Sequence, residues 1–126
     1  MIVVDTSALM AIVLDEDTAD RCEQVLADEP RLLISAVTLA EARIVAERRK
    51  VGNLMGLLLR EIAAEVVAVS GAGALSAVEA YREWGKGQHK ARLNICDCFA
   101  YALAKERDLP LLFAGDDFAH TDILAA

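Results

Sequence analysis

The chain has 126 residues, of which 13 are Lys or Arg and 20 are Asp or Glu, so its formal net charge is −7. This length predicts one domain over residues 1–126, large enough to bury a core and too small for a second catalytic module. The negative charge argues against a protein that coats nucleic acid through bulk positive charge, and the 56% of hydrophobic residues excludes intrinsic disorder.

Short apolar runs alternate with helical patterns along the chain. In chain order, the periodicity and capping residues predict a strand at residues 2–4, helices at 7–14 and 17–27, a strand at 32–34, helices at 35–49 and 54–64, a strand at 66–69, a helix at 70–84, a polar loop at 85–90, a helix at 94–107, a strand at 111–113 and a short last helix. Strands separated by helices indicate right-handed crossovers and a parallel sheet covered on both faces. We therefore predict an α/β fold, a three-layer α/β/α sandwich with a short, mainly parallel sheet.

The apolar run at residues 1–14 has no basic start and is interrupted by polar residues, so we expect neither a signal peptide nor a membrane span. The three cysteines are an odd number without a CxxC pair, which favours reduced thiols packed among apolar groups. The two histidines do not supply the ligand spacing of a zinc site. These features predict a cytoplasmic protein that does not contact membranes.

Acidic residues follow the predicted strands at the places where α/β proteins bind ligands. Asp5 follows the first strand, and Asp116 and Asp117 follow the fourth. Asp97 is the third residue after Asn94, the expected cap of the 94–107 helix. Each of these acids also has a plain structural explanation, since a carboxylate at a helix start complements the exposed N–H groups and the helix dipole.

Glu41 has no such explanation, because it falls within the apolar side of its predicted helix. Its neighbours on that face are mostly apolar: Val37, Thr38, Ile44, Val45 and Arg48. A carboxylate there is costly to bury unless a cation or hydrogen-bond donors meet it. One alternative is a buried ion pair with Arg48, and the other is a shared site with the strand-end acids.

Carboxylates drawn to one point repel one another and destabilise the fold unless a divalent cation neutralises them. A site whose ligands are all oxygen atoms favours Mg²⁺ or Mn²⁺ over zinc. The acids of this chain therefore predict a metal site built from carboxylates.

Four sequence blocks, in this order, resemble the motifs of PIN-domain nucleases. They are DTSAL at residues 5–9, LAE at 39–41, NICDCFAYALA at 94–104, and LLFAGDDF at 111–118 with TDI at 121–123. Their order and spacing and the length of the chain are similar to the VapC-type toxins of type II toxin–antitoxin systems. The resemblance covers essentially the whole chain and implies the PIN-like α/β/α fold.

The resemblance implies that Asp5, Glu41, Asp97 and Asp117 form an acidic quartet. Within this quartet, Asp5 and Asp97 are implied as the direct ligands of Mg²⁺ or Mn²⁺. Asp117 is preferred to Asp116 because the acid of the family motif directly precedes an aromatic residue, although the doublet leaves Asp116 as a supporting candidate.

The activity that the resemblance implies is metal-dependent cleavage of cellular RNA by a toxin. A water activated by the metal attacks the phosphodiester, and Thr6 or Ser7 supports the site through a hydroxyl or backbone hydrogen bond. The resemblance also implies a homodimer and a VapB-type antitoxin that blocks the site.

RNA binding by an acidic chain requires local positive charge. Lys86, Lys90 and Arg92 stand in the loop before the Asp97 helix, so we expect them to hold the RNA backbone, although a solvated surface is the alternative. A second basic cluster occupies residues 48–50. Trp84 is expected to pack beneath the loop, with base stacking as the alternative.

Other interpretations remain beside the toxin. A housekeeping PIN-domain nuclease for RNA processing is the closest alternative, and a receiver-like signalling domain is the non-enzyme one. A receiver needs a phosphorylatable Asp after its third strand, where this chain has Ser70 and Gly71. The apolar residues Met55, Leu58, Leu59 and Ile62 are expected in the core or in a dimer interface.

Overall fold

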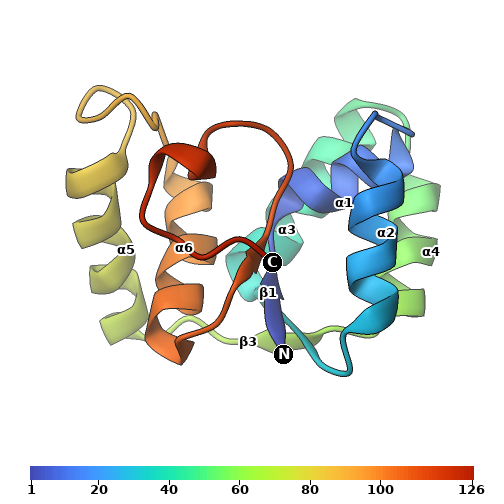
Figure 1. Ribbon diagram of the computed structural model, residues 1–126, viewed down its shortest axis with the longest axis horizontal. Helices are drawn as coiled ribbons and strands as arrows, with labels where there is room; N and C mark the ends of the chain where they lie inside the picture. The colour runs from blue at the N-terminus through green and yellow to red at the C-terminus, as the bar shows by residue number, and fades with distance from the viewer.

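Four short strands form a parallel sheet in the order β3-β2-β1-β4, in a computed structural model that describes residues 1–126 (Figure 1). The strands are β1 (Ile2–Val4), β2 (Leu32–Ser35), β3 (Glu65–Val67) and β4 (Leu111–Leu112). The helices are α1 (Thr6–Val13), α2 (Ala19–Asp28), α3 (Ala36–Arg48), α4 (Gly52–Ile62), α5 (Gly71–Trp84), α6 (Ile95–Arg107) and the 3₁₀ turn η1 (Phe118–His120).

Helices cover both faces of the sheet, as expected for strands whose side chains alternate between two buried faces. Val3 and Leu33 pack into a cluster with α5 and α6, whereas Ile2, Val4 and Ile34 pack into a second cluster with α1, α2 and α4. Figure 1 shows α5 and α6 on one side of β1 and α1, α2 and α4 on the other. The predicted three-layer α/β/α sandwich is confirmed.

The third strand differs from its prediction in position and burial. Residues 66–69 were expected as a buried strand, but β3 spans Glu65–Val67 and leaves Val66 49% exposed. The reason is tertiary: β3 lies at one end of the sheet and pairs with β2 alone, whereas β4 at the other end is bordered by Ala125 through a bridge to Leu111. An edge strand lacks a neighbour and a full helical cover on its outer side.

Helix α3 buries a narrower stripe than its apolar pattern predicts. Ile44 is 51% exposed, whereas Thr38, Ala42 and Ala46 are fully buried. These small side chains let the helix backbone approach the core closely, and the hydroxyl of Thr6 lies 3.4 Å from the carbonyl oxygen of Thr38. Glu41 lies about one turn after Thr38 on α3, so this close approach brings its side chain toward the end of β1.

The inner stripe of α4 belongs to the core. Met55 is fully buried, and Leu58, Leu59 and Ile62 pack against the same cluster as β1 and α1. The core role expected for these residues is therefore confirmed, and Leu58, Leu59 and Ile62 remain partly exposed. None of the helices is both long and apolar enough to cross a bilayer.

The order of the strands places a crevice beside β1. The chain moves outward from β1 to β2 and β3 on one side and returns to β4 on the other, so β1 and β4 flank the switch point. Ligands of open α/β sheets bind outside the carboxyl ends of the strands at such a point. Asp5 occupies this place, and its backbone N–H donates to the carbonyl oxygen of Leu112 at 2.9 Å.

The loop between α5 and α6 is closed on itself. Gly85 and Leu93 form an isolated bridge, and the N–H of Lys86 donates to the carbonyl oxygen of Leu93 at 2.9 Å. A side chain at Gly85 would place its Cβ 2.3 Å from the carbonyl oxygen of Tyr81, so only glycine fits. The loop delivers the chain directly to Asn94, the cap of α6.

Candidate metal centre

Three carboxylates from distant parts of the chain meet at the crevice. Asp5 follows β1, Glu41 lies on α3 and Asp97 lies in the first turn of α6, and one oxygen atom from each lies within 4.8 Å of those of the other two. Asp5 is 2% exposed, and the other two are half-buried. The sequence predicted that these three acids converge, and the structure brings them together.

Asp5 divides its two oxygen atoms between the helix and the site. Its Oδ2 caps α1 by accepting hydrogen bonds from the backbone N–H of Ser7 at 2.9 Å and from the Ser7 hydroxyl at 2.7 Å. Its Oδ1 is buried and has no hydrogen-bond partner. Because a buried oxygen without a partner is costly, the cap explains only half of this carboxylate.

Asp97 shows the same division at the start of α6. Asn94 and Asp97 form a capping box, in which the N–H of Asn94 donates to Asp97 Oδ2 and the N–H of Asp97 donates to Asn94 Oδ1, both at 2.9 Å. Oδ1 of Asp97 makes no hydrogen bond within the chain. Both aspartates therefore fix their helices with one oxygen and keep the other free.

Glu41 is held by a hydroxyl instead of a cation. The Thr6 hydroxyl donates to Glu41 Oε1 at 2.6 Å, whereas Arg48 is exposed and forms no ion pair. The buried Glu41–Arg48 pair that the sequence left open is wrong. Arg48 is the last residue of α3, two turns beyond Glu41, and its side chain is exposed.

Burial and mutual repulsion raise the pKa values of the two aspartates. Burial raises the pKa of Asp5 to about 6, with the charge of Glu41 adding to it and the Ser7 hydrogen bonds opposing it. Burial also raises the pKa of Asp97 to about 7, and the charge of Asp5 adds to it. The site therefore carries negative charge that the protein itself does not neutralise.

These residues fit a hard divalent cation. The donors are all carboxylate oxygens, and one of them, Oδ1 of Asp5, is buried without a partner. Mg²⁺ and Mn²⁺ prefer oxygen ligands of this kind. Cys96 lies beside the acids, but burial and the charge of Glu41 raise the pKa of its thiol to about 11, so it does not offer a thiolate.

Asp116 and Asp117 lie at the rim of the site. Both are exposed, and neither belongs to the group of three oxygens. Asp117 precedes η1 but makes no side-chain capping bond, so the helix-cap explanation does not hold for it. Its charge contributes to the raised pKa of Asp97, which places it near that carboxylate.

The basic side chains of the loop remain free. Lys86, Lys90 and Arg92 are exposed and form no ion pairs. Trp84 is half-buried beneath the loop, with its ring edge-on to that of His89 at a centroid distance of 4.8 Å. Packing beneath the loop, the role expected for Trp84, is confirmed.

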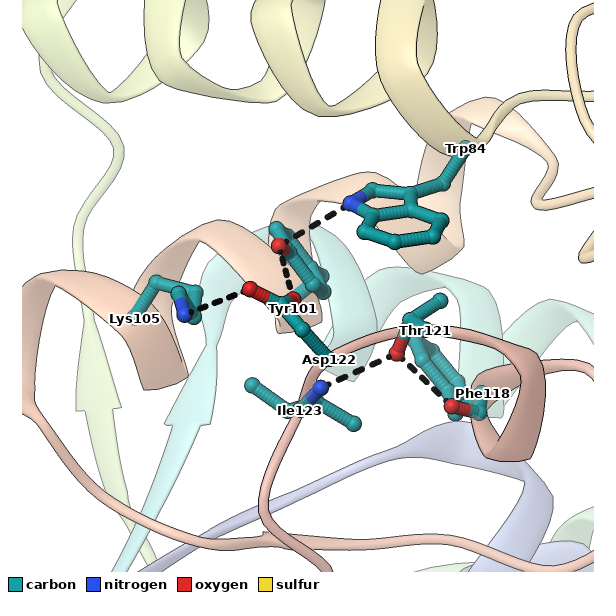
Figure 2. A network of polar contacts seen from close by, with 7 residues as sticks. All are labelled: Trp84, Tyr101, Lys105, Phe118, Thr121, Asp122 and Ile123. Carbon is teal, nitrogen blue, oxygen red and sulfur yellow. Dashed lines mark hydrogen bonds and ion pairs between the residues drawn. The ribbon is translucent and has the colours of Figure 1, made fainter.

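Two connections around the site escaped the sequence analysis. The Ser7 hydroxyl accepts a hydrogen bond from the N–H of Ala114 at 3.0 Å, which ties the segment after β4 to the start of α1. Figure 2 shows the other, a chain of polar contacts from Trp84 through Tyr101 to Asp122. Asp122 was part of a motif block, but no pattern joins it to a tyrosine 21 residues earlier.

The structure defines the class of protein: a small parallel α/β domain with a carboxylate cluster at the switch point of its sheet. Comparison with known proteins gives the family. The model of the PIN domain matches residues 2–124, so the chain belongs to the PIN-domain family. This membership excludes the receiver-like alternative.

The relatives of this chain are VapC ribonucleases, as the motif blocks predicted. Ribonuclease VapC30 of Mycobacterium tuberculosis is 46% identical over 124 residues, which cover 96% of this chain and 95% of the relative. Among solved structures, VapC20 of M. tuberculosis, a sarcin–ricin loop cleaving toxin, covers 100% of this chain and 98% of its own, with a TM-score of 0.79 at 17% identity. A toxin–antitoxin complex from Klebsiella pneumoniae covers 100% and 97%, with a TM-score of 0.74 at 20% identity.

The raised pKa values make the metal-free protein less stable as the pH rises. In the unfolded chain both aspartates titrate near 3.8, whereas in the folded protein Asp5 titrates at about 6 and Asp97 at about 7. Between these pKa values the folded state therefore binds more protons than the unfolded chain. The stability that these protons give is fully present below the unfolded pKa of 3.8 and is lost as the pH rises through the folded pKa values of about 6 and about 7.

We expect Asp97→Asn, which keeps an acceptor for Asn94, to melt above the wild type by roughly 3–6 °C near pH 8, with the difference vanishing below about pH 4. Thermal unfolding in EDTA between about pH 4 and pH 8 measures this difference in melting temperature. The exposed Asp20 on α2 supplies the control, and Asp20→Asn should track the wild type. Equal melting temperatures of Asp97→Asn and the wild type near pH 8 would contradict the repulsion.

Proposed function

We propose that this protein is a metal-dependent endoribonuclease toxin that cleaves cellular RNA and is neutralised by a cognate antitoxin. The observation that carries the proposal is the meeting of Asp5, Glu41 and Asp97 around the unpartnered oxygen of Asp5. The names of the relatives, all VapC ribonucleases, support the reaction class. The identity over nearly the whole chain favours a toxin over a housekeeping nuclease.

The residues of the site have separate roles in this proposal. Asp5 and Asp97 would hold Mg²⁺ or Mn²⁺ through the oxygens that their caps leave free. When bound, the cation would activate a water and offset the charge on the phosphate and the leaving oxygen. Glu41, whose Oε1 is fixed by Thr6, would orient the attacking water with its other oxygen, and Asp117 would support this role from the rim.

Replacing Asp97 by Asn should abolish cleavage without unfolding the protein. We expect the rate of RNA cleavage in Mg²⁺ to fall by at least about 100-fold, because one carboxylate oxygen with full charge is lost from the cation site. EDTA should cause the same loss in the wild type, and added Mg²⁺ or Mn²⁺ should reverse it. Wild-type activity in Asp97→Asn would refute the site, and Asp20→Asn controls for the loss of one acidic charge.

The basic loop supplies the positive charge that the acidic chain lacks as a whole. Lys86, Lys90 and Arg92 are exposed and unpaired, and the loop leads straight into the cap of α6 that holds Asp97. A phosphate backbone held by this loop therefore passes close to the carboxylates. We propose that these three side chains bind the RNA strand.

The triple change of Lys86, Lys90 and Arg92 to Ala should raise KM for RNA and flatten its salt dependence by up to about two units of log–log slope, since each phosphate contact on a single strand contributes about 0.7. The affinity for Mn²⁺ should not change. Neutralising residues 48–50 instead removes the same number of charges elsewhere and should have the smaller effect. Unchanged cleavage by the loop variant would exclude this loop as the RNA surface.

An apolar groove offers a place for the antitoxin. It lies between α2 and α4, has a volume of about 890 Å³ and includes Leu54 and Leu57, which are 51% and 55% exposed. Glu23 and Glu61 line it without forming ion pairs. An amphipathic helix with an apolar face and basic flanks matches this surface.

Leu57→Glu should weaken binding of a cognate VapB-type antitoxin by about tenfold or more, because it places a charge in the apolar groove. RNA cleavage should stay unchanged, since the groove is formed by α2 and α4 rather than by the elements that carry the acids. Leu75 on α5, which is 69% exposed, provides the matched control as Leu75→Glu. Titration calorimetry measures the affinity of each variant for the antitoxin. Equal affinities of Leu57→Glu and Leu75→Glu would place the antitoxin elsewhere.

The homodimer implied by the family resemblance remains a proposal. Apolar side chains outside the groove, on α3 and α5, are exposed at Ile44, Leu75 and Val78. Such positions supply apolar area that a second copy could cover.

A further inference from the structure

We propose that Tyr101 is a positioning residue, whose hydroxyl fixes the segment carrying Asp117 against the helix that carries Asp97. The inference rests on the proposed nuclease function. Tyr101 lies four residues after Asp97 on α6, so the two side chains stand one turn apart on the same side of the helix. Tyr101 itself is 6% exposed and belongs to the core cluster of α5 and α6.

The hydroxyl of Tyr101 has one fixed arrangement. It donates to Asp122 Oδ1 at 2.6 Å and accepts from Trp84 Nε1 at 3.0 Å (Figure 2). The indole can only donate and the carboxylate can only accept, so the single proton of the phenol must point to Asp122. This hydrogen bond also lowers the pKa of Asp122, which keeps the acceptor charged.

The segment after β4 depends on few attachments. Upstream of the acidic doublet, the N–H of Ala114 donates to the Ser7 hydroxyl; downstream, Asp122 reaches Tyr101. Between these points Asp117 makes no side-chain hydrogen bond, and only Phe118 is buried. The position of Asp117 relative to Asp97 is therefore set by the buried ring of Phe118 beside it and by the two ends of this segment.

Asp122 is linked to α6 itself, through the buried hydroxyl of Tyr101 and through the half-exposed amine of Lys105. Ser7 belongs to α1 and Phe118 packs against the ring of Phe113, whereas Tyr101 shares a rigid helix with Asp97. Through Trp84 the same hydroxyl also joins the end of α5, where the basic loop begins. One phenol thus holds together the three segments that carry Asp97, Asp117 and the loop.

Lys105 offers an internal control. Its Nζ pairs with Asp122 Oδ2 at 3.0 Å, but both side chains are about half exposed, and exposed pairs of this kind contribute little. Lys105→Gln removes this contact and leaves the bond from Tyr101 to Asp122 intact. A loss of RNA cleavage that is specific to Tyr101 should therefore be absent from the Lys105→Gln variant.

The test is a double-mutant cycle of Tyr101→Phe with Asp117→Asn, read out by RNA cleavage in Mg²⁺. We expect Tyr101→Phe to lower kcat by about 10- to 100-fold in the wild-type background, because a small misplacement of a reacting group is costly. In the Asp117→Asn background we expect a loss below about twofold, since residues that act through one another are not additive. An equal loss in both backgrounds, or no loss in the wild type, would overturn the proposal.

Amide hydrogen exchange tests the same link without RNA. Exchange in residues 114–122 should be faster in Tyr101→Phe and unchanged in Lys105→Gln, while α2 exchanges alike in all proteins. Should Tyr101→Phe fold poorly, Asp122→Ala removes the acceptor instead and should give the same pattern. Unchanged exchange in this segment would overturn the proposal, whereas an inactive wild type with the expected exchange pattern would refute the proposed function alone.

Discussion

Repulsion among Asp5, Glu41 and Asp97 is the constraint on which this structure depends. Burial and the charges of neighbouring carboxylates raise the pKa of Asp5 and of Asp97, and the fold must hold the three acids together without a cation of its own. It does so with hydrogen bonds to their oxygens: Ser7 donates to Asp5, Thr6 to Glu41, and the N–H of Asn94 to Asp97. Each donor lies on or beside the first turn of a helix, where unpaired N–H groups favour negative charge.

Elements governed by local chemistry were predictable from the sequence. Asp5, Ser35, Ser70 and Asn94 each cap the helix that follows, and these caps placed the helix starts to within a residue or two. The two-sided burial of the sheet followed from its apolar strands. The third strand was misplaced because its exposure depends on its edge position, which no local pattern records.

In the candidate site, too, single residues could be predicted from the sequence, but their contacts with distant segments could not. Glu41 stood out because a carboxylate on an apolar face requires a partner, but the partner was misjudged: Thr6 lies 35 residues away, and Arg48 is exposed. The bond between Tyr101 and Asp122 was likewise invisible, since neither residue is unusual where it stands in the sequence. Short motifs identify reactive groups, whereas the contacts that orient those groups arise only once distant segments have met.

Asp5 and Asp97 each serve both at the start of a helix and in the carboxylate cluster, and this double role has a consequence for the site. Because one oxygen of each side chain is bound by the first turn of its own helix, the helix also sets the direction of the other oxygen. A chain of 126 residues can therefore carry a preorganised site. A substitution at Asp5 or Asp97 would therefore change the start of a helix as well as the carboxylate cluster.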